Sequence, residues 1–174
     1  MSGSDTLSNG LRFALLLFLQ VFLFRQIGLV FSEKDYLAVL VSPLFIALLP
    51  LATPRPLVVL AGFALGLGTD FFYESLGVHM SAAVFLGYVR RFILGALEPR
   101  DGYKVEANSR GRDLSLNWWM TYIALCLLAY CGWYFAMEFF SPVFWRDILL
   151  KTVISVPVSW VAGMAFVFLA RPRV

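Results

Sequence analysis

The feature that most constrains this chain is a succession of six apolar blocks separated by short polar segments. A helix that crosses the hydrocarbon core of a bilayer needs about 20 predominantly apolar residues. The chain has 174 residues, of which 60% are hydrophobic, whereas a soluble domain has about 45–50%. The blocks therefore predict an all-α integral membrane protein with one domain over residues 1–174 and no separate soluble domain.

We expect six spanning helices and one longer cytoplasmic loop. The expected spans are 11–31, 36–51, 56–72, 76–97, 116–137 and 147–170, and the loop is 98–115. The second block is short and contains Pro43, which predicts a kink or a local thinning of the membrane. The third block begins at Pro56, and the first turn of a helix is where proline is tolerated.

The basic residues set the expected orientation, because cytoplasmic loops carry an excess of Lys and Arg. With a cytoplasmic N-terminus, ten of the 14 basic residues lie inside. These ten are Arg12, Arg55, Arg90, Arg91, Arg100, Lys104, Arg110, Arg112, Arg171 and Arg173. The other four are Arg25, Lys34, Arg146 and Lys151. We therefore expect both termini in the cytoplasm and the turn after the third span on the extracytoplasmic side.

Neither the net charge nor the cysteines indicate a nucleic-acid partner, a disulfide or a metal site. The net charge is +3, but the basic residues lie between apolar blocks rather than in one run, so we expect no nucleic-acid partner. Cys126 and Cys131 lie in one apolar block, five residues apart, and therefore project in different directions around a helix. A disulfide or a metal site built on them is not expected.

Familiar enzyme signatures are missing from the sequence. It contains no G-x-S-x-G, H-E-x-x-H or P-loop pattern, and His79 is its single histidine. Ser81 lies only two residues from His79 and therefore on another face of a helix, which does not favour an intramembrane serine protease. We expect a protein without catalytic residues, without a metal and without a cofactor.

Residues 66–80, GLGTDFFYESLGVHM, gather Asp70, Glu74 and His79 where the third span turns into the fourth. Asp70 and Glu74, four residues apart, would share a helix face, and with His79 they would suit a three-ligand metal site or a catalytic group. Alternatively, these groups satisfy the helix ends, with Ser75 or Glu74 capping the next helix. A third possibility is contact with a partner protein. The position in a hairpin favours the structural interpretation.

Two further features leave alternatives open. Gly62 and Gly66 form a G-x-x-x-G pattern, which lets another helix approach closely, either inside the bundle or from a partner. Arg90 and Arg91 lie near the cytoplasmic end of the fourth block. They either extend to lipid headgroups, or one of them points into the bundle to meet a buried acid or a partner.

The order of these motifs resembles the MreD family, the rod shape-determining membrane proteins of bacteria. The resemblance rests on LLPLATPRP, then LAGFALGLGTDFFYESLGVHMSAAVFLGYVRRFIL, then EPRDGY, and covers residues 45–103. Its core is a glycine-rich span ending in an aspartate, a short turn, LGVH at the start of the next span and YVRRF at its end. Outside this core the likeness is one of hydropathy alone.

The resemblance implies a non-enzymatic scaffold in the bacterial cytoplasmic membrane that takes part in the regulation of cell shape. Proteins of this family work with the extracytoplasmic coiled-coil protein MreC in the complex that joins MreB filaments to the peptidoglycan polymerase and transpeptidase. Their membrane fold is similar to the substrate-binding subunits of energy-coupling-factor vitamin transporters. The residues at the motif positions, expected to be structural or partner-binding, are Gly62, Gly66, Gly68, Asp70, Gly77, His79 and Arg90.

A small-molecule binding subunit of a membrane transporter is the alternative function. The six blocks and the acids near the outer face would suit it, but it would also need an outward pocket with convergent polar groups. The sequence lacks the clear A-x-x-x-A pattern with which such a subunit would dock on its coupling partner. A membrane-assembly factor with other partners is a third, weaker possibility.

Overall fold

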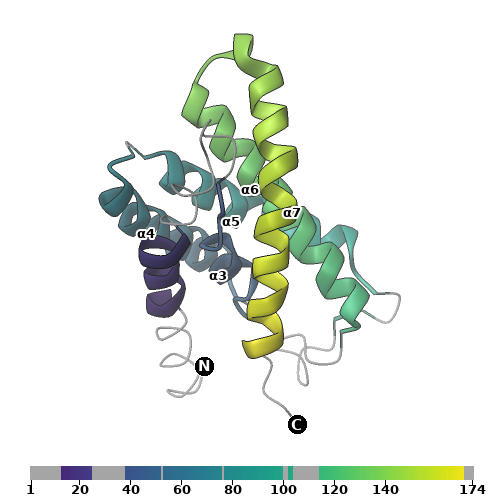
Figure 1. Ribbon diagram of the computed structural model, residues 1–174. Helices are drawn as coiled ribbons and strands as arrows, with labels where there is room; N and C mark the ends of the chain where they lie inside the picture. Colours follow the sequence, from purple (N-terminus) through teal and green to yellow (C-terminus); the bar gives the residue numbers. More distant parts are fainter. Residues whose placement is uncertain are drawn as a thin grey trace.

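The computed structural model describes residues 13–24, 38–51, 53–75, 77–99, 102–103 and 114–170 (Figure 1). Within these ranges the regular structure is entirely helical, which confirms the expected all-α class. The elements are η1 (Leu19–Phe24), α3 (Pro43–Ala47), α4 (Arg55–Tyr73), α5 (Val78–Ala96), α6 (Leu116–Phe139), η2 (Pro142–Phe144) and α7 (Trp145–Ala170). A further helical stretch over residues 13–18 leads into η1, whose turns are π-helical.

Some predictions fall on other parts of the chain. Nine of the basic residues used for the orientation lie outside the described residues: Arg12, Arg25, Lys34, Arg100, Lys104, Arg110, Arg112, Arg171 and Arg173. Most of the loop 98–115 and the second half of the expected span 11–31 lie outside them as well.

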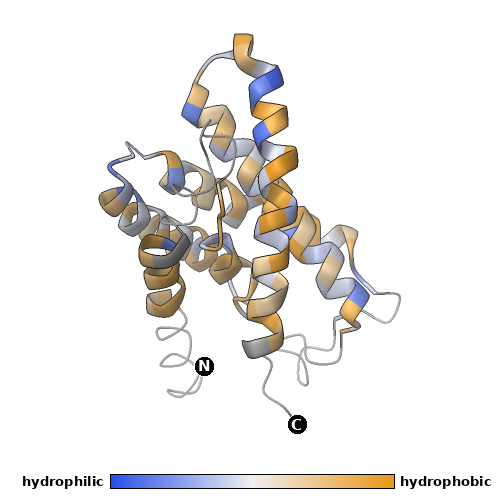
Figure 2. Ribbon diagram, viewed as in Figure 1, coloured by the Kyte–Doolittle hydropathy of each residue, from blue (hydrophilic) through white to orange (hydrophobic). Residues whose placement is uncertain are grey.

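Three of the helices are long and apolar enough to cross a membrane, so the chain is a membrane protein. They are α4, α6 and the segment Trp145–Phe168 of α7. Figure 2 shows apolar residues along most of α7, with hydrophilic residues near its upper end. Helix α5 has the same length as α4, 19 residues, but it carries His79, Arg90 and Arg91.

The long helices pack in the order of the chain. Helices α4 and α5 form a hairpin, α5 also packs against α6, and α6 packs against α7. The short α3 lies against α4, α5 and α6. Tyr122, Ile123 and Leu127 of α6 are fully buried, together with Leu65 of α4 and Leu86 of α5. Helix α6 is therefore the element around which the core is assembled.

The second apolar block departs most from the prediction. Residues 38–41 are not helical, and only Pro43–Ala47 forms a helix. Pro43 occupies the first turn of α3, so it begins a helix where the sequence predicted a kink. In place of a continuous span, the described part of this block is an irregular segment followed by five helical residues.

Side chains of α7 hold this irregular segment. The backbone N–H of Ala38 donates to Oγ of Ser155 at 3.1 Å, and that of Leu40 donates to Oγ of Ser159 at 2.9 Å. The two serines are four residues apart and therefore share a helix face. Irregular backbone at membrane depth is stable only where protein groups satisfy it, so α7 supplies the hydrogen bonds that a helix would otherwise make internally.

The far end of α5 is tied to the beginning of α6. The Tyr103 hydroxyl donates to the carbonyl of Leu94 at 2.7 Å, and Nε1 of Trp118 donates to the carbonyl of Leu97 at 2.8 Å. Partial burial raises the pKa of the Tyr103 hydroxyl. The tyrosine that ends the EPRDGY motif thus fixes the segment that follows α5.

Candidate functional site

The motif residues meet at the turn between α4 and α5. Helix α4 ends with Glu74 in the left-handed conformation, at φ 55°. Gly77 then precedes α5 at φ 85°, a conformation that glycine adopts without strain. Glu74 is exposed and lies beyond the last helical residue. Asp70 and Glu74 consequently do not form the shared helix face that a three-ligand metal site would require.

Asp70 caps α5 from the preceding helix. Its Oδ1 accepts hydrogen bonds from the backbone N–H of His79 at 2.9 Å and from Oγ of Ser75 at 2.6 Å. Its Oδ2 accepts from the N–H of Met80 at 2.9 Å. The first N–H groups of a helix lack internal partners, and this buried carboxylate satisfies two of them. The expected cap, Ser75 or Glu74, is wrong, because Ser75 donates to Asp70 instead.

The glycines bring the two helices into backbone contact. A Cβ on Gly62 would lie 2.7 Å from the carbonyl oxygen of Ala83, and one on Gly66 would meet the backbone of Met80. Gly87 of α5 takes part in the same contact from the other helix, because a Cβ added there would lie 3.2 Å from Cα of Val59. The G-x-x-x-G pattern therefore packs against α5 inside the bundle, which is the first of the two alternatives that the sequence allowed.

Gly68 faces another neighbour. A Cβ there would lie 2.7 Å from Cδ1 of Leu17, on the helical stretch before η1. The contact is with the end of a flexible side chain rather than with backbone. Of the three glycines of α4, Gly68 is accordingly the one at which a methyl group is most easily accommodated.

His79 points into the centre of the bundle and is fully buried. Its Nδ1 lies 3.1 Å from the hydroxyl of Tyr130, which lies 3.4 Å from Oγ of Ser42. The rings of Tyr73 and Tyr134 flank the imidazole, with centroids at 4.9 and 4.7 Å. Nε2 has no hydrogen-bond partner among the residues that the structure describes.

A glutamine that sequence reasoning missed completes this polar centre. Oε1 of Gln20 accepts from the N–H groups of Val41 at 2.6 Å and of Ser42 at 3.0 Å. Its Nε2 donates to the carbonyl of Val39 at 3.1 Å and to the hydroxyl of Tyr73 at 3.0 Å. Two donors and two lone pairs exhaust an amide side chain. The available signal was a glutamine with only apolar residues on either side for several positions, in the first apolar block.

Arg90 closes the opposite end of α5. It is 3% exposed, and its Nε donates to the hydroxyl of Tyr122 at 3.0 Å. One terminal nitrogen donates to the carbonyls of Leu49 at 2.5 Å and Pro50 at 3.3 Å. Of the two neighbouring arginines, Arg90 thus points inward while Arg91 is exposed. Arg90 therefore follows the alternative in which one arginine points into the bundle, but its hydrogen-bond partners are two carbonyls and a hydroxyl rather than a buried acid.

These contacts give the motif residues a mechanical role. Asp70 and the glycines fix α4 to α5, Arg90 fixes α5 to the chain after α3, and Tyr122 in turn donates to the carbonyl of Ala47 at 3.0 Å. Within the described residues, no group of three or more His, Cys, Asp or Glu side chains is placed to hold a metal ion. The arrangement can hold helices together through hydrogen bonds that the surrounding lipid cannot replace.

Comparison with family models, with curated proteins and with solved structures finds no match for this chain.

Proposed function

We propose that the chain is a non-enzymatic scaffold of the MreD type in the bacterial cytoplasmic membrane, acting in the cell-wall elongation complex that regulates cell shape. The observation that carries the proposal is that the polar motif residues make hydrogen bonds that join helices. Asp70 accepts three hydrogen bonds across the α4–α5 turn, and Arg90 donates three at the other end of α5. A motif whose polar groups hold helices suits a protein that presents surfaces to partners.

The outward surface supports the same interpretation. Large apolar side chains are exposed along α4, at Leu60, Leu67 and Phe71, and along α7, at Val153 and Val161. In a membrane protein such faces meet either lipid or the spanning helices of partners. The partner proposed is an MreC-like protein with one spanning helix. Contact with MreB filaments, the wall polymerase and the transpeptidase would be indirect.

The proposed topology has six spans with both termini in the cytoplasm, a fold similar to the energy-coupling-factor substrate-binding subunits. In Figure 1 the first described helix begins, and α7 ends, toward the same lower end of the view, while the α6–α7 turn lies at the upper end. This arrangement is what a cytoplasmic location of both termini requires. Cysteine-accessibility labelling of loop positions in intact cells would test the topology independently of any partner.

Co-purification tests the function. The tagged chain, extracted in mild detergent from a bacterium that encodes it, should retain an MreC-like single-span protein. Depletion of the chain should convert rods to rounded cells, and re-expression should restore them. Gly66→Ala should fail to restore shape, whereas Gly95→Ala should succeed, because a Cβ on Gly95 meets nothing within 4 Å. Normal rods and normal wall insertion after depletion would overturn the proposal.

The alternative, a vitamin-type substrate-binding subunit, has one observation in its favour. The buried polar centre around Gln20, His79 and Tyr130 leaves Nε2 of His79 without a partner among the described residues. A tight ligand of the folded state raises the melting temperature. A thermal-shift screen of the purified protein against water-soluble vitamins would therefore distinguish the two functions, since the scaffold should show no shift.

A further inference from the structure

Two arginines lie opposite each other at the end of the α4–α5 hairpin that is remote from its turn. The close contacts between the two helices follow one antiparallel register: Gly66 with Met80, Gly62 with Ala83, and Val59 with Gly87. One further turn of each helix leads from Val59 to Arg55 and from Gly87 to Arg91. Arg55 and Arg91 are therefore neighbours across the two helices, on the edge where α4 and α5 meet.

Both guanidinium groups are available for an anion. Arg55 and Arg91 are exposed, and neither has a hydrogen bond or an ion pair with another residue that the structure describes. The next described acid after Arg91 along the chain is Glu98, beyond the last residue of α5. Its Oε1 lies beside Gly102, 3.9 Å from the position of an added Cβ. Among the described residues, the positive charge of this pair is thus left without a neutralising acid.

Arg90 adds a third positive charge on the buried side of the pair. It directly precedes Arg91 and is 3% exposed. Its described hydrogen bonds go to one hydroxyl and two carbonyls, which are neutral groups. Like charges repel more strongly where the dielectric constant is low, as it is at the edge of a membrane. An anion bound to Arg55 and Arg91 would relieve this repulsion.

The surroundings place the pair at the level of lipid headgroups. Arg55 is the first residue of α4, and Arg91 lies in the last two turns of α5. Trp118, which is tied to the end of α5, is of a residue type that concentrates where hydrocarbon meets headgroups. Tyr88 and Phe92 flank Arg91 and are 61% and 57% exposed, with ring centroids 5.6 Å apart. The surface beside the guanidinium groups is therefore apolar and aromatic.

We propose that Arg55 and Arg91 together bind the phosphodiester of one anionic phospholipid. Both side chains donate charge-assisted hydrogen bonds to the phosphate oxygens, and the acyl chains extend past Tyr88 and Phe92. A zwitterionic headgroup binds less well, because its own cation opposes the guanidinium groups. The exposed aromatic rings favour a lipid over an acidic protein segment or a free phosphate. The proposal does not depend on the cell-wall function.

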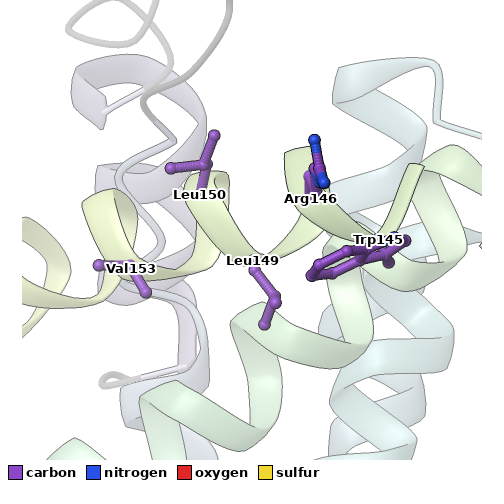
Figure 3. Close-up of a pocket in the computed structure, with 5 residues that line it drawn as sticks. All are labelled: Trp145, Arg146, Leu149, Leu150 and Val153. Atoms are coloured by element: carbon purple, nitrogen blue, oxygen red, sulfur yellow. The ribbon is translucent and has the colours of Figure 1, made fainter.

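Arg146 provides a matched control at the opposite end of the bundle. It is exposed, like Arg55 and Arg91, but it is the single arginine of α7, and its guanidinium carbon lies 5.4 Å from the ring centre of Trp145. The hollow along the first turns of α7 (Figure 3) lies on one helix, and its walls are almost entirely apolar. Arg146 therefore has no second guanidinium with which to share a phosphate.

Native mass spectrometry of the purified protein in detergent micelles tests the proposal. From a mixture of phosphatidylglycerol and phosphatidylcholine, the chain should retain one copy of phosphatidylglycerol. Arg55→Gln and Arg91→Gln should each weaken this retention about tenfold, the effect of losing one charge-assisted hydrogen bond. Arg146→Gln should leave it unchanged. Melting temperatures equal to that of the wild type, measured without added lipid, would show that the variants are folded.

The double variant of Arg55 and Arg91 separates one shared phosphate from two independent headgroups. If one phosphate bridges both side chains, the second substitution should add little to the first, because the bridge is already broken. Multiplied effects, about a hundredfold in total, would overturn the proposal, since each arginine would then hold its own lipid. Equal retention of phosphatidylcholine, or displacement of the lipid by inorganic phosphate, would also overturn it.

A remaining outcome would assign the pair to a protein. Both single variants would then keep phosphatidylglycerol but lose a co-purifying membrane partner, and the anion would be an acidic side chain of that partner. The lipid measurement uses the purified chain alone. Its failure is therefore distinguishable from a failure of the proposed cell-wall function, which is tested in cells.

Discussion

The Asp70 carboxylate accepts the backbone N–H of His79 at 2.9 Å, across the turn that joins two antiparallel helices. The acid belongs to the end of α4, and the N–H belongs to the first turn of α5. One buried side chain thereby fixes both the end of one helix and the beginning of the next. The distance between the two residues along the chain is short, but their contact requires the turn at Gly77 to form correctly.

Replacing Asp70 should separate the effect of its charge from that of its hydrogen bonds. Asp70→Asn keeps an oxygen for His79 and Ser75 but directs an amide group at the N–H of Met80, so we expect a loss of about 1–2 kcal/mol in unfolding free energy. Asp70→Leu removes every acceptor and should lose about 3 kcal/mol or more. Unfolding by SDS in mixed micelles measures both. Equal losses would show that the negative charge itself is required, and Glu74→Gln, at an exposed position, should have no effect.

The glycines offer a paired test of close packing. Gly66→Ala drives a methyl group into the backbone of Met80 and should lower the unfolding free energy by about 1–3 kcal/mol, as overpacking at a rigid contact does. Gly95→Ala, with open space around it, should instead stabilise α5 by up to about 1 kcal/mol. The comparison is made by thermal unfolding in detergent. A neutral result at Gly66 would remove the basis for assigning the G-x-x-x-G pattern to the hairpin.

Arg90 and Arg91 form a second pair, adjacent in sequence and different in environment. Arg90→Lys keeps the charge but cannot reach the Tyr122 hydroxyl and the two carbonyls with a planar fork, so a loss of about 2–3 kcal/mol is expected. Arg91→Gln should remain within about 0.5 kcal/mol of the wild type. Tyr122→Phe should reproduce part of the Arg90 loss. If Arg90→Lys were as stable as the wild type, charge alone would account for this arginine.

Gln20→Leu should be the most damaging change in the first described helix. It leaves the N–H groups of Val41 and Ser42 and the carbonyl of Val39 without the partners that they have in the structure. Each unsatisfied buried group costs about 1–3 kcal/mol, so the protein should fail to accumulate or should unfold at much lower SDS. Ser159→Ala, which removes a single acceptor, should cost about 1–2 kcal/mol. Equal stability of both variants would show that water replaces these bonds.

Hydropathy predicted the long helices well, because the apolar residues that identify each helix are neighbours in the sequence. The expected ranges 116–137 and 147–170 overlap α6 (Leu116–Phe139) and α7 (Trp145–Ala170) closely. The same reasoning failed for the block 36–51, which does not form a continuous helix. Its backbone is satisfied by Gln20, Ser155 and Ser159, residues up to 119 positions away, and no local pattern reports such distant acceptors.

The sequence predicted which motif residues form the candidate site, but only part of how they are arranged. The sequence placed Asp70 and His79 at a helix turn, but it could not show which group caps α5, because a capping carboxylate three residues before the end of α4 has no sequence signature. The direction of Arg90 was likewise open, since its partners, Tyr122 and the carbonyls of Leu49 and Pro50, come from other parts of the chain.

The irregular segment before α3 has a consequence for biosynthesis. Ala38 and Leu40 leave the ribosome more than a hundred residues before Ser155 and Ser159, the groups to which their N–H groups donate. During most of translation these two amides must be hydrated or held by the insertion machinery. Integration of the segment before α3 is consequently completed only when α7 has been inserted, and nascent chains arrested before α7 should remain associated with the translocon.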